Sequence, residues 1–312
     1  MKKLLVIFFL VFSIASCQQS PVYKPIEGWS EEINERIENF LNSTISIKER
    51  KVAVFDCDGT TFGQVPYYLD DESVFRYADE VLKPRSDSVA MGKLAILDRM
   101  LENGDNVSKI FVEDRVHFFA GLTVEEIENI GYDCYHNMYK GKFYPEMKAL
   151  IENLKAYGFE VWTMTAAPEL LYQKFVSEEL GISPVNIVGV KSVVRNGIAT
   201  REIIPPVPQD DGKAYAIETF IKTKPLIVGG NSRGDMDMLH CSAGLKILIN
   251  PDDVTVRGPE DGPMNGHTVR SYWEKEGALI VRCHDVADPD KVFHTGKWGI
   301  GKNRSNPKGS SE

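Results

Sequence analysis

The sequence predicts an α/β fold, in which a parallel sheet forms the core and a helical subdomain is inserted after the first strand. Short apolar runs that end in turn residues alternate with helical stretches, which is typical of strands buried on both faces of a parallel sheet. Residues 61–158 separate the first apolar run from the second, and most of them have helical periodicity. This segment is too long for one crossover connection, so we expect a separate helical unit there.

The elements follow one another in a regular order. Ser30 can cap a helix over residues 30–42, whose apolar residues recur at helical spacing. The predicted strands are 52–55, 159–164, 185–190, 226–228 and 245–249, and the helices near them are 145–157, 169–180 and 214–223. We assign 29–61 and 159–300 to the core, 62–158 to a helical cap and 301–312 to a polar tail. A cap inserted there lies over the carboxyl ends of the strands, where ligands bind in such sheets.

Composition excludes several classes of protein. Of the 312 residues, 43% are hydrophobic and 26% are charged, which is ordinary usage for a globular chain. The 45 acidic and 36 basic residues give a formal charge of -9, which repels phosphate backbones, so we expect no nucleic acid partner. No disulfide is predicted among the later cysteines, and the oligomeric state stays open.

The first residues have the pattern of an export signal. Two lysines precede an apolar run over residues 4–16, which is too short to span a membrane as a helix but suits a signal peptide. The four residues that end at Cys17 resemble the lipobox of bacterial lipoproteins. We therefore expect 1–16 to be a signal peptide that is removed, Cys17 to be lipidated and 17–28 to be a tether. The expected location is the bacterial cell envelope, on its periplasmic or extracellular face, with an ordinary secretory signal as the alternative.

Two carboxylates stand one residue apart directly after the first predicted strand. They belong to the run Asp56-Cys57-Asp58-Gly59-Thr60, in which a glycine turn follows the acids. Such a pair can divide nucleophilic and acid–base work between two carboxyl groups, or it can bind Ca²⁺ or cap a turn. Its position at the end of a buried strand favours the catalytic interpretation.

This run resembles the first motif of the haloacid-dehalogenase-like hydrolases, and three later segments are similar to the other motifs of that superfamily. Thr165 directly follows the second predicted strand, where the superfamily has Ser or Thr, although Thr163 is a rival two residues away. Lys213 matches the lysine of the third motif. Residues 229–239 resemble the fourth motif of phosphoserine-phosphatase-like members, with Asp235 in the place of the metal ligand.

The fourth motif departs from the superfamily at one position. Asn231 stands where many relatives have the first acid of the motif. Its carbonyl oxygen can still accept from a metal-bound water, but the exchange removes one negative charge and would weaken the affinity for Mg²⁺. Asp237 is a candidate to compensate.

The resemblance implies a Rossmann-like core and a Mg²⁺-dependent phosphatase. Asp56 would be the nucleophile that forms an aspartyl phosphate, and Asp58 would protonate the leaving alkoxide and then deprotonate the attacking water. Mg²⁺ would be held by Asp56, the backbone carbonyl of Asp58, and Asp235, together with phosphate and waters. The residues that the resemblance implies for binding the phosphate are Thr165, Ala166 (through its backbone), Lys213 and Asn231.

The cap is expected to select the substrate, since it closes over the leaving group. Its aromatic residues, with Glu72 or Glu113, are candidates to cage the quaternary ammonium of phosphocholine, as in the exported phosphocholine phosphatases that the chain resembles. Arg76 or Arg115 are candidates for the carboxylate of phosphoserine. We expect a small amino-alcohol phosphate: phosphocholine, phosphoethanolamine or phosphoserine. The alternatives are a phosphatase or phosphotransferase for a larger substrate, a catalytically weak binding lipoprotein, and aromatic residues that only fill the core of the cap.

Overall fold

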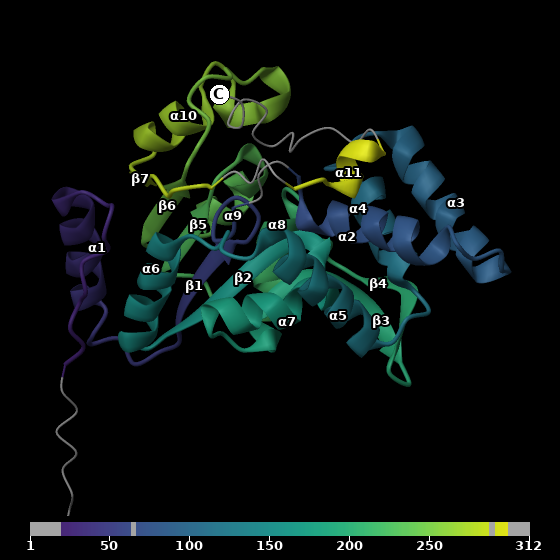
Figure 1. Ribbon diagram of the computed structural model, residues 1–312. Helices are drawn as coiled ribbons and strands as arrows, with labels where there is room; N and C mark the ends of the chain where they lie inside the picture. The colour runs from purple at the N-terminus through teal and green to yellow at the C-terminus, as the bar shows by residue number, and fades with distance from the viewer. Residues whose placement is uncertain (1–19, 64–66, 287–290, 299–312) are drawn as a thin grey trace, which may run out of the picture.

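A seven-stranded sheet lies at the centre of the computed structural model, which describes residues 20–63, 67–286 and 291–298 (Figure 1). The strand order is β4-β3-β2-β1-β5-β6-β7, and neighbouring strands are parallel except for the antiparallel pair of β3 and β4. The bounds are β1 Lys51–Asp56, β2 Phe159–Pro168, β3 Ile187–Arg195, β4 Ile198–Ile204, β5 Ile227–Gly230, β6 Leu245–Ile249 and β7 Leu279–Val281. The predicted α/β class with a mostly parallel core is therefore confirmed.

The two strands that the sequence did not predict are β4 and β7. β3 continues past its predicted end to Arg195 and turns back through Asn196 and Gly197, which both have positive φ, as a two-residue hairpin requires. The hairpin is partly exposed, so it lacks the continuous apolar run that identifies the central strands. β7 is an edge strand of three residues that no motif in the sequence accompanies.

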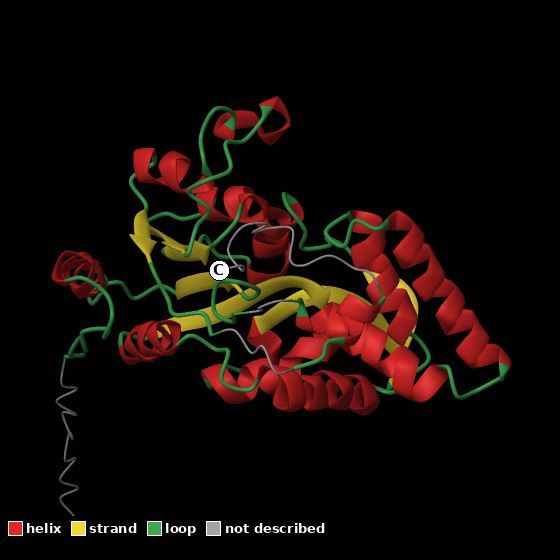
Figure 2. Ribbon diagram, turned by 45° about the horizontal axis from the view of Figure 1, so that its top comes forward, coloured by secondary structure: helices red, strands yellow, loops and turns green. Residues whose placement is uncertain are grey.

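Helices cover both faces of the sheet, as Figure 2 shows. Their bounds are α1 Glu31–Ser43, α2 Leu69–Tyr77, α3 Ser88–Asn103, α4 Lys109–Phe119, α5 Val124–Cys134, α6 Pro145–Ala156, α7 Glu169–Leu180, α8 Gly212–Ala216, α9 Met236–His240, α10 Val269–Lys275 and α11 His294–Lys297. Ser30 caps α1 as predicted, because its side chain accepts from the backbone of Ile33. The chain between β1 and β2 forms α2 to α6, and α6 packs on β2 although it lies within the range predicted for the cap.

The chain before α1 differs from the predicted tether. Tyr23 and Ile26 are buried, and the Tyr23 hydroxyl donates to Asn34 Oδ1 over 2.7 Å. The backbone N–H of Lys24 donates to Asn153 of α6 over 2.8 Å. These contacts fix the segment between α1 and α6, so residues 20–28 are part of the folded body. The expected signal peptide, Cys17 and the tail 301–312 lie outside the described residues.

The C-terminal segment connects the far edge of the sheet with the cap. After β7 the chain leads to α11, the yellow helix in Figure 1, which packs on α2. No motif in the sequence indicated a role for this region.

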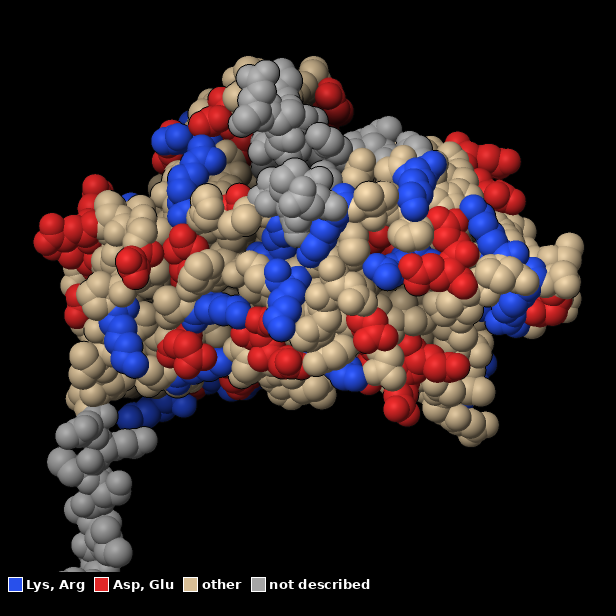
Figure 3. All heavy atoms as spheres, viewed as in Figure 1, with Lys and Arg blue, Asp and Glu red and all other residues tan. Residues whose placement is uncertain are grey.

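The described part of the chain has no helix with the length and apolar character that crossing a membrane requires. Its four cysteines, Cys57, Cys134, Cys241 and Cys283, are free. On the face seen in Figure 3, lysine and arginine side chains are interspersed with aspartate and glutamate.

Candidate active site

Three charged side chains meet where β1 and β5 end. Asp56 is the last residue of β1, and Phe55 pairs with Gly229 of β5, so the loops that follow these two strands are neighbours. Lys213 Nζ lies 2.6 Å from Asp56 Oδ1 and 2.6 Å from Asp235 Oδ1. None of the three residues is more than 6% exposed. The fold therefore joins three predicted site residues that are far apart in the sequence.

The negative charge in this cluster exceeds what one lysine neutralises. Burial and repulsion by Asp235 raise the pKa of Asp56 to about 8, and attraction by Lys213 offsets only part of this effect. Burial acts against the charge on Lys213, but Asp235 and Asp56 raise its pKa above the ordinary value. Lys213 is therefore charged at neutral pH, while the paired carboxylates favour an additional cation or a proton.

Asp58 is held by two hydroxyl groups. Thr165 Oγ1 donates to Asp58 Oδ2, and the Tyr172 hydroxyl donates to Asp58 Oδ1 over 2.9 Å. Burial raises the pKa of Asp58, and these two hydrogen bonds act in the opposite direction. A carboxyl group with a raised pKa is suited to proton donation near neutral pH. Tyr172 belongs to α7, and no motif in the sequence indicated it.

Two glycines allow the loops to approach each other. Gly59 has φ of 90°, and a Cβ atom there would lie 2.1 Å from Asn231 Nδ2. A Cβ atom on Gly230 would lie 2.6 Å from the Cβ of Asp235. Larger residues at these positions would force Asn231 and Asp235 away from Asp56.

Asp235 is also held by backbone groups. Its Oδ2 accepts from the N–H of Asn231 over 2.9 Å and from the N–H of Ser232 over 3.0 Å. With Lys213 on Oδ1, both carboxylate oxygens of Asp235 have protein partners. Its orientation toward Asp56 is therefore fixed before any ligand binds.

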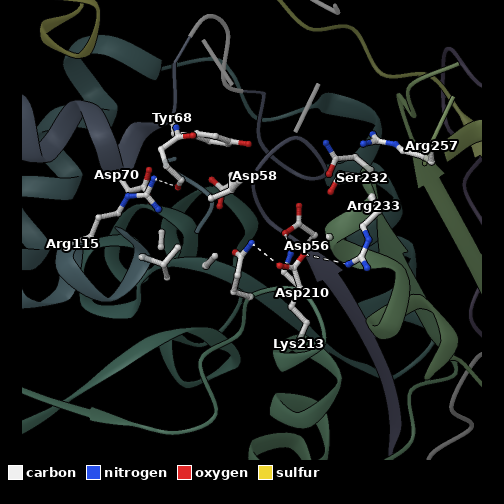
Figure 4. A pocket seen from close by; sticks show the side chains of 18 residues that line it. Asp56, Asp58, Tyr68, Asp70, Arg115, Asp210, Lys213, Ser232, Arg233 and Arg257 are labelled. Carbon is white, nitrogen blue, oxygen red and sulfur yellow. Dashed lines mark hydrogen bonds and ion pairs between the residues drawn. The ribbon is translucent and has the colours of Figure 1, made fainter. Parts of the chain in front are cut away.

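A cavity of about 230 Å³ opens over these groups (Figure 4). The predicted site residues that line it are Asp56, Asp58, Ala166, Lys213 and Asn231. Asp235, which contacts Lys213, does not line the cavity, and neither does Thr165, whose hydroxyl donates to Asp58. Thr163, the rival of Thr165, is fully buried and does not line it either.

The oxygen atoms at the strand ends match the chemistry of Mg²⁺. The described residues contain no group of three or more His, Cys, Asp or Glu side chains placed to hold a metal. Mg²⁺ commonly binds through only one or two carboxylates together with waters and a substrate phosphate. Asp56 and Asp235 offer two carboxylates, and burial together with the repulsion by Asp235 raises the pKa of Asp56. Asn231, whose backbone N–H donates to Asp235, lines the cavity beside them. Asp237, considered as a compensating acid, does not line the cavity.

Two walls of the cavity were not identified from the sequence as a site. The cap wall consists of Tyr68, Asp70, Asn106, Val107, Val112 and Arg115, of which Arg115 and, as one of the cap aromatics, Tyr68 were candidates. The core wall includes Gln209, Asp210, Arg233 and Arg257. In Figure 4 Tyr68, Asp70 and Arg115 lie on one side of Asp56, and Arg233 and Arg257 lie on the other. Acidic residues are common in the first turn of a helix, where they interact favourably with the helix dipole. The sequence therefore did not distinguish Asp70 as a binding residue.

The expected aromatic cage is not formed by the candidate residues. Those of the cap core are at most 2% exposed: Phe62, Phe75, Phe111, Phe118 and Phe119. Among the described residues that line the cavity, Tyr68 is the single aromatic. Glu72, Glu113 and Arg76 do not line it. A small helical unit needs its large apolar side chains for its own core, which explains their position.

Comparison with known proteins agrees with this fold. The model of the haloacid dehalogenase-like hydrolase family matches residues 53–240. Phosphoserine phosphatase SerB1 of Mycobacterium tuberculosis is 25% identical over 140 residues, which cover 43% of this chain and 44% of that protein. A putative hydrolase of Mycobacterium leprae, ML2424, is 25% identical over 140 residues, covering 43% of this chain and 45% of its own length. The match thus spans less than half of these relatives.

Two solved structures of proteins with unknown function share the fold. The protein from Anaerococcus prevotii has a TM-score of 0.58 and 13% identity, and the match covers 85% of this chain and 98% of that one. The protein from Bordetella pertussis has a TM-score of 0.55 and 15% identity, with 75% and 99% covered.

Proposed function

We propose that this chain, which belongs to the haloacid dehalogenase-like hydrolase family, is a Mg²⁺-dependent phosphomonoesterase for a small phosphate ester. The observation that carries the proposal is the arrangement at the end of β1. Asp56 lies beside a lysine that also contacts Asp235, and Asp58 is held by Thr165 and Tyr172 at the same cavity. The Asp56 carboxylate thus lies next to the positive charge of Lys213, and the Asp58 carboxyl group is held where it can exchange a proton with the substrate.

The proposed reaction divides the hydrolysis into two displacements. An Asp56 carboxylate oxygen attacks phosphorus, the bond from phosphorus to the alcohol oxygen breaks, and Asp58 donates its proton to that oxygen. Water then attacks the aspartyl phosphate, Asp58 takes up a proton from the water, and phosphate leaves with the Asp56 carboxylate restored. The products are one alcohol and one phosphate, and both carboxyl groups return to their first state.

Lys213 and Mg²⁺ would neutralise negative charge on the phosphate during these steps. Lys213 Nζ, already 2.6 Å from Asp56, would bind the phosphoryl oxygens together with the backbone N–H groups near Ala166. Asp56, the backbone carbonyl of Asp58, and Asp235 would hold Mg²⁺, with Asn231 beside them. When bound, the ion supplies positive charge that neutralises the phosphate and lowers the repulsion between the carboxylates.

The substrate that we propose is an amino-alcohol phosphate. A cavity of about 230 Å³, partly walled by the cap, favours a small leaving group over a macromolecule. One relative of this chain is a phosphoserine phosphatase by name, at 25% identity over 140 residues. Phosphocholine is less favoured than the other two candidates, because the cavity wall has a single aromatic residue among those described.

Hydrolysis of a generic aryl phosphate tests the proposed function. The purified protein should release phosphate with Mg²⁺ and stop when a chelator removes the metal. Asp56→Asn should lose turnover, while Asp237→Asn, a neighbouring acid outside the cavity, should keep it. Turnover that survives in Asp56→Asn would refute the proposal, and phosphate binding without hydrolysis in the wild type would favour a binding lipoprotein instead.

We also propose that the chain is held at a membrane of the bacterial cell envelope through a lipid on Cys17, at its periplasmic or extracellular face. The support is the short apolar run before Cys17 in the sequence. Lipoprotein maturation attaches several acyl chains, so the protein should stay in the membrane fraction through washing. Cys17→Ser should release it or block its processing, whereas soluble wild-type protein would contradict the anchor.

A further inference from the structure

The cap wall of the cavity contains a buried group of two acids and one arginine. Arg115 Nη1 lies 2.9 Å from Asp70 Oδ2, and Arg115 Nη2 lies 2.8 Å from Asp71 Oδ1. The three side chains are 6% exposed or less. Asp70 and Asp71 come from the first turn of α2, and Arg115 comes from α4. One guanidinium therefore serves two carboxylates, which leaves the group with one net negative charge when all three are ionised.

Only part of this group faces the cavity. Asp70 and Arg115 line it, whereas Asp71 does not. Asp71 also accepts from Arg115 Nε over 2.9 Å and from Asn106 Nδ2 over 2.8 Å, so its charge is taken up within the cap. Asp70 also has partners, since its Oδ2 contacts Arg115 and its Oδ1 accepts from the backbone N–H of Asp71 over 2.8 Å. One guanidinium does not balance both acids, and Asp70 is the acid of the pair that faces the cavity.

Asn106 adds a neutral acceptor to the same wall. It is buried, it lines the cavity, and its Nδ2 is already committed to Asp71. A bound molecule can therefore use the remaining side-chain oxygen of Asn106. Val107 and Val112 supply apolar surface beside it. The wall thus combines one carboxylate that shares its guanidinium with a second acid, one amide oxygen and a short apolar surface.

This wall is placed on the leaving-group side of the site. In Figure 4 Asp58 lies between Asp56 and Asp70. Asp58 is the proton donor in the proposed function, so the alcohol oxygen of the substrate must lie beside it. The rest of the alcohol then extends toward Asp70 and Asn106.

We propose that Asp70, with Asn106, recognises a primary ammonium on the alcohol of the substrate, so that the substrate is an aminoalkyl phosphate without a carboxylate. This inference rests on the proposed function and narrows it. An ammonium has N–H groups to donate to both residues, whereas a quaternary ammonium has none. Arg115 is occupied by two carboxylates and has no charge left for a carboxylate on the substrate.

The titration of Asp70 agrees with this assignment. Burial raises the pKa of Asp70 to about 8, Arg115 acts in the opposite direction, and the neighbouring acids Asp71 and Asp58 add to the increase. A cation beside Asp70 would favour the ionised carboxylate and complete the charge balance of the wall.

The test compares phosphoethanolamine with n-propyl phosphate, which has the same number of heavy atoms but a methyl group in place of the ammonium. For the wild-type protein with Mg²⁺ we expect kcat/KM to favour phosphoethanolamine by at least about tenfold. Asp70→Asn should reduce this ratio toward one, mainly by slowing phosphoethanolamine. Asp98→Asn, which removes an exposed acid from the same cap, should leave the ratio unchanged.

Two further substrates test the wild-type protein without any substitution. Phosphocholine and phosphoserine should each have a kcat/KM below that of phosphoethanolamine by about tenfold or more. A ratio of phosphoethanolamine to n-propyl phosphate near one, or a preference for phosphoserine, would overturn the inference. If the protein hydrolyses an aryl phosphate but does not prefer phosphoethanolamine to n-propyl phosphate, the inference about Asp70 is wrong while the proposed function stands. If it hydrolyses none of the esters, the proposed function fails and the inference fails with it.

Discussion

The Thr165 hydroxyl donates its hydrogen bond to the Asp58 carboxylate rather than facing the cavity. The resemblance to the hydrolase motifs implied that this hydroxyl binds the phosphate. In the structure Thr165 is fully buried at the end of β2 and fixes the carboxyl group that would exchange the proton. We therefore treat Thr165 as a positioning residue for Asp58.

Thr165→Val should slow alkyl phosphates more than aryl phosphates. An alkoxide needs a proton as it leaves, whereas a phenolate leaves more readily without one, and general acid catalysis contributes on the order of a hundredfold or more. We expect kcat to fall by about tenfold for an alkyl ester and by less for an aryl ester. Steady-state rates for both esters measure this difference.

Thr165→Ser is the matched control, because it keeps the hydroxyl group and should restore the alkyl rate. The hydrogen bond lowers the pKa of Asp58, so Thr165→Val should also move the basic limb of the pH–rate profile to higher pH. Equal losses for both esters with an unmoved profile would indicate only a structural role.

Lys213→Met should destabilise the metal-free protein. The substitution leaves Asp56 and Asp235 buried and without their shared cation. Removing one partner of a buried ion pair costs about 3 kcal/mol or more, and we expect a loss of that size in the free energy of unfolding by urea. Lys275→Met, at an exposed position of α10, is the control. An unchanged unfolding midpoint for Lys213→Met would contradict the charge balance described for the cluster.

Asp56→Asn should change how the stability of the metal-free protein depends on pH. The folded-state pKa of Asp56 is about 8, which is above its ordinary value. The stability that this group contributes is therefore complete at low pH and is lost as pH rises through about 8. One pKa unit corresponds to about 1.4 kcal/mol, so the variant should gain at least about that much over the wild type between pH 5 and pH 9. Urea unfolding in a chelator measures this gain, and a constant difference would refute it.

The predictable part of the site is local in the sequence. Asp56 and Asp58 directly follow an apolar run, and the carboxyl ends of parallel strands must meet at one edge of the sheet. Lys213 and Asp235 were found because each lies in a motif beside a predicted strand or helix. The order of the motifs along the chain therefore placed these groups without any knowledge of side-chain packing.

The cap wall had no such local signal. Asp70 and Arg115 are 45 residues apart on two helices, and their contact depends on how α2 packs against α4. Arg257 reaches the cavity from a segment after β6 that has no motif. Periodicity predicts that a helix exists, but it does not fix which helix faces lie together, so these residues required the structure.

Glu72→Gln should destabilise the protein by loosening the C-terminal segment from the cap. Glu72 is fully buried on α2, and its carboxylate accepts from the backbone N–H groups of His294 and Thr295, each over 3.0 Å, and from the Thr295 hydroxyl over 2.8 Å. A glutamine presents one amide N–H₂ to these donors and removes the charge that strengthens the bonds. Hydrogen bonds to a charged group contribute about 1.5–3 kcal/mol, so we expect a loss of about 2 kcal/mol in urea unfolding.

Limited proteolysis separates local release of this segment from general unfolding. Trypsin should cleave Glu72→Gln after Lys291 or Lys297 faster than the wild type, because these lysines flank the contacts with Glu72. Cleavage elsewhere in the core should be unchanged at low protease concentration, where local opening dominates. Glu102→Gln, at an exposed position of α3, should match the wild type in both measurements. If Glu72→Gln also matched the wild type, the contact between α2 and α11 would contribute little to the stability of the cap.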